Sequence, residues 1–218
     1  MNILVCIKQV PDTTEIKIDP VKHTLIREGV PSIVNPFDAC VLEMAVRLKE
    51  KEGGKVIVIS MGPAQAKNAL KECLAVGADQ AFLVTDRAFG GSDTLATSYI
   101  LSCAIKKVAE LEGGFDAIFC GKQAIDGDTA QVGPQIAEKL HLPQVTYAAD
   151  IKKDGDTITV QRMLEDGYMT IKVQTPCLLT CIKELNDPRY MSIGGILSTY
   201  SKPLTTLGYE DLKDHPLI

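Results

Sequence analysis

The chain has 218 residues, of which 45% are hydrophobic and 23% are charged, and its net charge is −5. This length suits one α/β domain with a full core, and the modest negative charge argues against general binding of nucleic acid or anionic membrane. No apolar run reaches the length of a membrane span, and the N-terminus begins with a strand-like segment rather than a cleavable leader. We therefore expect a cytoplasmic protein.

Strands and helices alternate over the first two thirds of the chain, which is typical of a mostly parallel sheet. We expect strands at 2–7, 55–61, 80–84 and 115–120, helices after Asn35, Pro63 and Asp93, and a polar, hairpin-like insertion at 15–27. Asn35 is predicted to cap the first helix, with Pro36 at its first position and Asp38 near the positive end of its dipole. The predicted buried stripes are Val41, Met44, Ala45 and Leu48 for the first helix, and Leu95, Tyr99, Ala104 and Val108 for the third.

Beyond Pro143 the pattern changes to alternating apolar residues. Turn sequences at 154–156 and 165–168 predict two β-hairpin turns there. The segment 186–200 has no periodicity and is expected to be an exposed loop. We therefore divide the chain into a domain at 1–185, with a β-hairpin extension at about 148–175, the loop at 186–200 and a tail at 201–218.

The most informative segment is 121–137, which we call the cradle. It follows an apolar run, is rich in small polar residues and leads into a helical pattern, so its backbone N–H groups and helix dipole suit a phosphate. Two starts of the following helix fit the residues. Either Asp128 is the cap and the Gln131 side chain bonds back to the backbone of Asp128, or Gly133 is the cap and Pro134 is the first helical residue.

Two further loops, at 10–12 and 61–63, are expected to join the cradle at the carboxyl edge of the sheet. Ligands of open parallel sheets bind at that edge. The cradle is not a P-loop, since no Ser or Thr follows Lys122, and no G-x-G-x-x-G follows the first strand. The segment 90–93 is interpreted as a turn and helix cap.

Metal and thiol chemistry have little support. The three histidines stand alone, and Asp126 and Asp128 fit loop and cap roles better than metal binding. The seven cysteines lie mostly in apolar runs without C-x-x-C spacing, so we expect reduced core thiols. Cys177 and Cys181 share one strand face; a redox pair is conceivable there, but two packed small hydrophobes are favoured.

Several segments together resemble the β subunit of electron transfer flavoproteins. They are Asn35-Pro36-Phe37, 45–50, 62–66, 76–79, 121–126, Pro143-Gln144 and 185–190, and their order and spacing are specific. The resemblance runs from residue 3 to about residue 200. It implies a three-layer α/β fold with a mostly parallel, Rossmann-like adenine-nucleotide-binding sheet, in a heterodimer with an α subunit.

In ordinary members of that family the β subunit holds AMP, whereas in electron-bifurcating members the same pocket holds a second FAD that takes hydride from NADH. Gly127, Thr129 and Ala130, together with 90–97, look like the bifurcating pattern. The hypothesis is that electrons from NADH split between ferredoxin or flavodoxin and, through the α-subunit FAD, an acyl-CoA or hydroxyacid dehydrogenase of anaerobic metabolism. A carrier with AMP in the cradle is the alternative, and a non-redox adenine-nucleotide sensor is the more distant one.

The resemblance also assigns residues. No side chain is expected to act as a catalytic acid or base, or as a metal ligand. The cofactor-binding residues carried over are Cys6, Asn35, Pro36, Phe37, Asp38, Met61, Gly62, Asp93, Thr94, Thr97, Gly121, Lys122, Gln123, Asp126, Gly127, Asp128, Thr129, Ala130, Gln131, Val132, Gly133, Pro134 and Gln135. The loop at 186–200 corresponds to the segment that grips the dehydrogenase, with Tyr190, Ile193, Ile196 and Leu197 as contacts. The chain stops short of the C-terminal extension usual in the family, and truncation is an open explanation.

Overall fold

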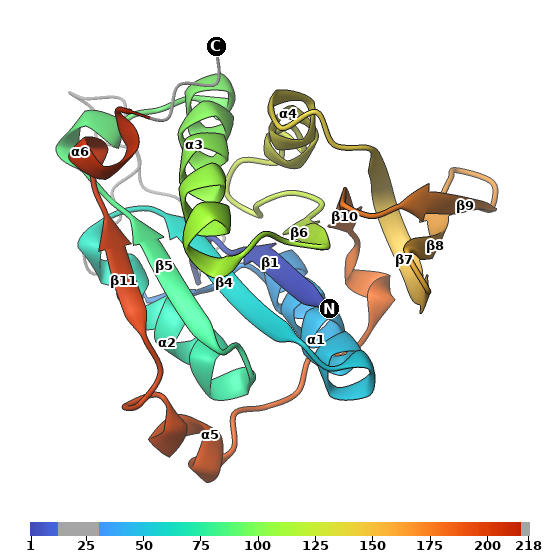
Figure 1. Ribbon diagram of the computed structural model, residues 1–218, viewed down its shortest axis with the longest axis horizontal. Coiled ribbons are helices and arrows are strands. Elements are labelled where there is room, and N and C mark those ends of the chain that lie inside the picture. The colour runs from blue at the N-terminus through green and yellow to red at the C-terminus, as the bar shows by residue number, and fades with distance from the viewer. Residues whose placement is uncertain (13–30, 215–218) are drawn as a thin grey trace.

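The computed structural model describes residues 1–12 and 31–214, so the predicted insertion at 15–27 lies outside the described residues. Within the described part, one sheet has nine strands in the order β11-β5-β4-β1-β6-β10-β7-β8-β9 (Figure 1). The strands are β1 Asn2–Cys6, β4 Lys55–Met61, β5 Gln80–Val84, β6 Ala117–Gly121, β7 Gln144–Asp154, β8 Thr157–Met163, β9 Tyr168–Gln174, β10 Cys177–Cys181 and β11 Leu204–Leu207. A separate antiparallel pair joins β2, Gln9–Pro11, to β3, Ser32–Val34.

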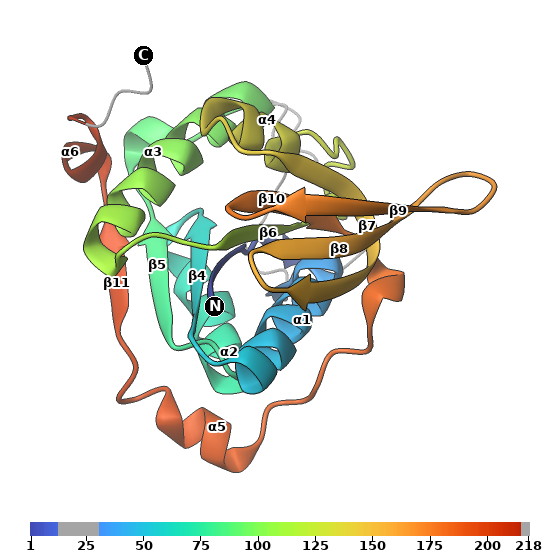
Figure 2. The ribbon, with the colours of Figure 1, turned by 45° about the vertical axis from the view of Figure 1, so that its right-hand side comes forward.

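The helices form the two outer layers. They are α1 Pro36–Glu52, α2 Lys67–Val76, α3 Thr94–Glu112, α4 Val132–Lys139, α5 Ile193–Ser198 and α6 Tyr209–Leu212, with short 3-10 turns η1 Ala64–Ala66, η2 Arg87–Phe89 and η3 Lys183–Leu185. Figure 2 shows α1 and α2 on one face of the sheet and α3 and α4 on the other. One buried cluster lies on each face, and the expected three-layer α/β fold is confirmed.

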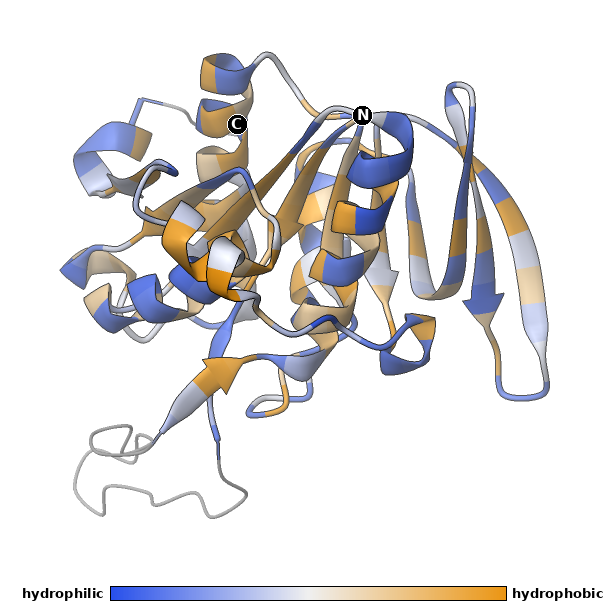
Figure 3. Cartoon of the chain, turned by 90° about the horizontal axis from the view of Figure 1, so that it is seen from below, coloured by the Kyte–Doolittle hydropathy of each residue, from blue (hydrophilic) through white to orange (hydrophobic). Residues whose placement is uncertain are grey.

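Burial explains the contrast between the central and the outer strands. All five residues of β5 are buried, whereas β9 is mostly exposed. Figure 3, coloured by hydropathy, shows mostly hydrophobic residues along the central strands and a mixture of hydrophobic and hydrophilic residues along the outer hairpins. Central parallel strands are covered on both faces and read as continuous apolar runs, while strands with one solvated face alternate. The two predicted hairpin turns are present, because β7, β8 and β9 pair antiparallel in sequence.

The predicted stripe of α3 is wrong in its first half. Leu95 and Tyr99 are 60% and 37% exposed, whereas Ser98 and Ser102 are fully buried. The Ser102 hydroxyl donates to the carbonyl of Ser98, and Ser98 donates to that of Leu95, so both serines are satisfied within the helix. Buried serines of this kind are invisible to a hydrophobic pattern.

The segment 186–200, which we call the arm, is not wholly a loop. It contains α5, where the Ser192 hydroxyl accepts from the N–H of Gly195. A Cβ on Gly195 would lie 2.2 Å from the carbonyl oxygen of Ala75 at the end of α2. The glycine that argues against a helix in the sequence is therefore required for α5 to pack against α2.

All seven cysteines are free thiols, and every one except the half-buried Cys6 is buried, as expected. Cys177 and Cys181 both lie in the core cluster on the α1 and α2 face. Among the described residues, no helix is long and apolar enough to cross a membrane.

Candidate nucleotide site

The main cavity lies at the carboxyl edge of the sheet, over β1 and its neighbours β4 and β6. From β1 the chain passes through α1 to β4 and then to β5 on one side, and it returns through α3 to β6 on the other. Strand order reverses between β1 and β6, and this is where open parallel sheets bind ligands. The cavity encloses about 1040 Å³ and extends from the cradle to the turn after β5 and the start of α3.

Most of the predicted cofactor-binding residues line this cavity. They are Cys6, Asn35, Asp38, Met61, Gly62, Asp93, Thr94, Thr97, Gly121, Lys122, Gln123, Gly127, Asp128, Thr129, Ala130, Gln131, Val132 and Gly133. Pro36, Phe37, Asp126, Pro134 and Gln135 are not among the lining residues. Phe37 instead lies under the Lys183 ammonium, which is 4.9 Å from the ring centre, and Asp126 binds the Lys8 ammonium at 2.6 Å.

One of the three predicted loops is placed wrongly. The segment 10–12 does not line the cavity, because Val10 is buried and belongs to the β2–β3 pair. Ile7 and Lys8, which directly follow β1, take its place. The loop at 61–63 lines the cavity as expected.

Both predicted starts of α4 are wrong. The helix begins at Val132, with Gln131 at the cap position and no side chain capping it. Asp128 accepts a hydrogen bond from the Gln123 amide at 2.5 Å instead of capping the helix. Val132 and Gly133 therefore present the first turn of α4 to the cavity, and uncapped N–H groups at a helix start favour an anion.

Two features keep this first turn close to the sheet and shape the loop before it. A Cβ on Gly133 would lie 2.7 Å from the Thr180 methyl group, so glycine is required for α4 to approach β10. Asp128 and Ala130 have positive φ angles of 50° and 52°, which are uncommon for residues with side chains. Such backbone outliers cluster at ligand sites, where the surrounding structure holds them.

Asn35 occupies the predicted cap position, but its side chain does not cap α1. Its Nδ2 donates to the carbonyl of Gln123 at 2.9 Å, and its Oδ1 accepts from the N–H of Ile125 at 3.2 Å. The side chain therefore holds the cradle, and its amide is used by a loop that is distant in sequence.

The cavity wall carries three cationic side chains. Lys8 pairs with Asp126, the Lys122 ammonium lies 5.1 Å from the centre of the Tyr147 ring, and Arg87 is exposed after β5. Four residues after β5 also line the cavity although their sequence was not singled out, and they are Thr85, Asp86, Arg87 and Phe89. The sequence could have indicated them, because they directly follow a predicted strand, which was the reason for choosing the other three loops.

The starts of two helices are in contact at the rim of the cavity. The Thr94 hydroxyl donates to the Gln131 side-chain carbonyl at 2.8 Å, which joins the beginning of α3 to the residue before α4. Among the described residues, no cluster of three metal-ligating side chains is present.

The predicted partner-binding residues lie on the arm and are not among the residues that line the cavity. Tyr190 is 97% and Ile193 is 81% exposed, and Ile196 and Leu197 are also exposed. Large apolar side chains exposed as a group mark an interaction surface.

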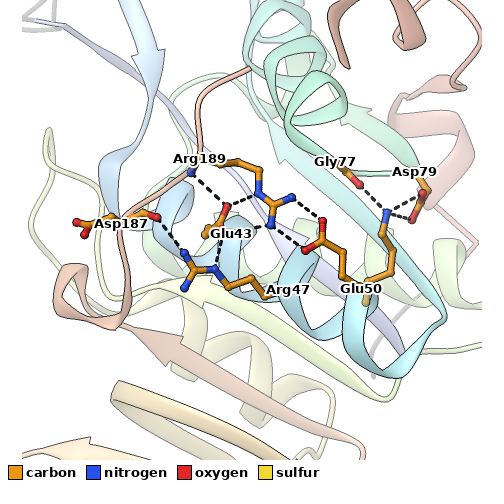
Figure 4. Close-up of polar contacts among 8 residues, drawn as sticks. Glu43, Arg47, Glu50, Gly77, Asp79, Asp187 and Arg189 are labelled. Atoms are coloured by element: carbon orange, nitrogen blue, oxygen red, sulfur yellow. Dashed lines mark hydrogen bonds and ion pairs between the residues drawn. The ribbon is translucent and has the colours of Figure 1, made fainter. Parts of the chain in front are cut away.

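The base of the arm is fixed to α1 by an ion-pair network (Figure 4). Arg189 binds Glu43, which is 2% exposed, at 2.7 Å and Glu50 at 2.6 Å. Arg47 also pairs with Glu43 and donates to the carbonyl of Asp187. Hydrogen bonds to Glu50 and Glu43 raise the pKa of Arg189.

The structure is that of an α/β protein with a cavity at the carboxyl edge of its parallel sheet and a separate arm that exposes large apolar side chains. Comparison with known proteins agrees, since residues 22–212 match the electron transfer flavoprotein domain. The chain belongs to the electron transfer flavoprotein β-subunit family.

Three relatives illustrate the similarity. The electron transfer flavoprotein subunit beta of Thermoanaerobacterium thermosaccharolyticum is 64% identical over 93% of this chain and 76% of its own length. The caffeyl-CoA reductase-Etf complex subunit CarD of Acetobacterium woodii is 59% identical over 97% of this chain and 80% of its own length. The acryloyl-CoA reductase electron transfer subunit gamma of Anaerotignum propionicum is 56% identical over 100% of this chain and 81% of its own length.

Proposed function

We propose that this chain is the β subunit of an electron-bifurcating electron transfer flavoprotein and that its cavity holds FAD, with NADH as the hydride donor. The observation that carries the proposal is the extent of the cavity. It encloses about 1040 Å³ and continues from the cradle past β1 and β4 to the residues after β5. AMP would occupy one part of this space, whereas FAD contains AMP and adds a second phosphate and a flavin.

The lining residues fit a dinucleotide. The first turn of α4 and the small residues of the cradle suit a phosphate, because N–H groups and a helix dipole are directed at it without bulky side chains. Lys122 and Arg87 on the cavity wall favour further negative charge, whereas Lys8 is already paired with Asp126. Apolar residues, among them Ile59, Phe89 and Leu101, offer a surface for an aromatic ring system.

When bound, FAD would supply the redox chemistry, accepting hydride and passing electrons on. The residues of this chain would bind and orient it. Asn35 would hold the cradle backbone, and the contact between Thr94 and Gln131 would hold the start of α3 against the cradle.

The arm supports a partner role. One relative is named as a subunit of a caffeyl-CoA reductase-Etf complex, and another as an electron transfer subunit of acryloyl-CoA reductase. We propose that the exposed Ile193 and its neighbours bind a flavin-dependent acyl-CoA or hydroxyacid dehydrogenase, and that ferredoxin or flavodoxin is the second acceptor. Ile193 suits the anchor of such an interface because it is large, apolar and exposed on a supported helix.

An anaerobic NADH titration of the purified heterodimer with the α subunit tests the proposal. We expect NADH to bleach the flavin absorbance without a dehydrogenase present. A single FAD per heterodimer that NADH does not reduce would contradict the proposal and favour the AMP-containing carrier. A complex without flavin would favour a nucleotide sensor.

A further inference from the structure

The first turn of α1 lies between the ends of β1 and β6, below the entrance to the cradle. Asp38 is 5% exposed there, and its two carboxylate oxygens accept hydrogen bonds from two different segments. Oδ2 accepts from the N–H of Lys8 at 2.8 Å, just after β1, and Oδ1 accepts from the N–H of Gly121 at 3.1 Å, at the end of β6. One carboxylate thus joins the two strands that flank the switch point.

Only a glycine at position 121 leaves room for this contact. A Cβ at that position would lie 2.2 Å from Oδ1 of Asp38 and 2.7 Å from the Cβ of Phe37. No side chain can be added without displacing the carboxylate or the first turn of α1. The glycine at the start of the cradle is therefore required by Asp38.

Asn35 extends the same contact along the loop. It binds the carbonyl of Gln123 and the N–H of Ile125, so the first turn of α1 holds the backbone of the cradle at three points between 121 and 125. Gly121 and Gln123 line the cavity themselves. Any loosening of this attachment changes the wall that faces the nucleotide.

The surroundings of Asp38 make its charge sensitive to pH. Burial raises its pKa from 3.8 to about 7, against the lowering effects of hydrogen bonds from Lys8, Asn35 and Gly121 and of the Lys8 charge. The charge of Asp38 in turn raises the pKa of three nearby thiols, which are Cys73 on α2, Cys120 on β6 and Cys181 on β10.

These three thiols stay protonated near neutral pH. Burial raises the pKa of Cys73 and Cys181, and a hydrogen bond with Cys6 together with burial raises that of Cys120. Among Asp38 and these three thiols, Asp38 is the group that changes charge between pH 6 and 8.

We propose that Asp38 is a positioning residue for residues 121–125, the first part of the cradle. As a carboxylate it holds this segment in place, and it loosens that hold when it is protonated, so that nucleotide affinity falls as the solution is acidified. A carboxylate accepts strongly at both oxygens, whereas protonation removes the charge and leaves the protonated oxygen a weaker acceptor. One of the bonds to Lys8 and Gly121 is then weakened. This inference rests on the proposed function, in that the cavity must bind a nucleotide.

The test measures the dissociation constant of FAD from the heterodimer between pH 5.5 and 8.5, since the pyrophosphate of FAD does not titrate in that range. We expect wild-type affinity to fall about tenfold on acidification through pH 7, the effect of one hydrogen bond whose acceptor loses its charge. Asp38→Asn is expected to bind FAD more weakly at pH 8.5 and to show no dependence on pH.

Asp116→Asn is the matched control. Asp116 also accepts a backbone hydrogen bond, from Asn2 at 2.7 Å, but it is exposed and lies before β6, at the amino edge of the sheet. It should reproduce the wild-type pH profile. Equal profiles for wild type and Asp38→Asn would overturn the inference while leaving nucleotide binding intact. Failure of the wild type to bind FAD at any pH would instead refute the proposed function.

A second measurement needs no variant. Hydrogen exchange at the Gly121 and Lys8 amides of the wild-type protein, corrected for the intrinsic effect of pH, should lose protection at one of these positions below pH 7. Protection that is unchanged at both amides would contradict the loosened hold of Asp38, even if Asp38→Asn does not fold.

Discussion

Replacing Asp38 by asparagine should change how the stability of the protein depends on pH. The pKa of Asp38 is about 7 in the folded chain against 3.8 for the ordinary group. Between these values the folded chain binds a proton that the unfolded chain has released, so Asp38 contributes stability at low pH that is lost as pH rises toward and through 7. The amide introduced by Asp38→Asn is neutral throughout and contributes no such slope.

The magnitude follows from the pKa. From pH 5 to 7, each pH unit lowers the free energy of unfolding by about 1.4 kcal/mol through this one group. The wild type should therefore lose about 2.5 kcal/mol of stability relative to Asp38→Asn between pH 5 and 8. Urea unfolding of both proteins at each pH measures the difference, and the pH dependence of all other groups cancels. A wild-type-minus-variant difference that is constant within about 0.5 kcal/mol would refute the burial and protonation described for Asp38.

Three further predictions concern the cradle and the arm. Gly133→Ala should destabilise the chain by about 1–2 kcal/mol and weaken nucleotide binding, because the added Cβ would overlap β10. The control Gly127→Ala should leave the unfolding midpoint unchanged, because nothing lies within 4 Å of its added Cβ. Equal unfolding midpoints for the two variants would contradict this prediction. Arg189→Gln removes a guanidinium from the buried Glu43, so proteolysis within the arm should accelerate; unchanged cleavage rates would argue against the network. Ile193→Ala should raise the KM for the dehydrogenase about tenfold with NADH reduction of the flavin unaffected, measured by steady-state kinetics, and an unchanged KM would exclude it as the anchor.

The sequence predicted the elements whose boundaries are set locally. β4 and β5 have the predicted ends, because glycines or other turn residues bound an apolar run on both sides. The end of α2 before Gly77 was equally clear, since a glycine follows the last periodic residue.

What failed depended on contacts that are distant in sequence. The Asn35 amide is used by Gln123 and Ile125 rather than by its own helix, and no pattern near Asn35 indicates this. The first turn of α4 packs so closely on β10 that a Cβ on Gly133 would lie 2.7 Å from the Thr180 methyl group, and no pattern near Gly133 indicates this contact. The loop at 61–63 and most of the cradle line the cavity because strand ends of a parallel sheet meet at one edge, but the other walls of the cavity depend on tertiary packing.

The central claim is that the cavity of this chain holds FAD, and the most direct test is the nucleotide content of the purified heterodimer. Acid extraction followed by mass spectrometry should yield two FAD and no AMP for each heterodimer. One FAD together with one AMP would contradict the claim and identify a carrier whose flavin lies in the α subunit alone.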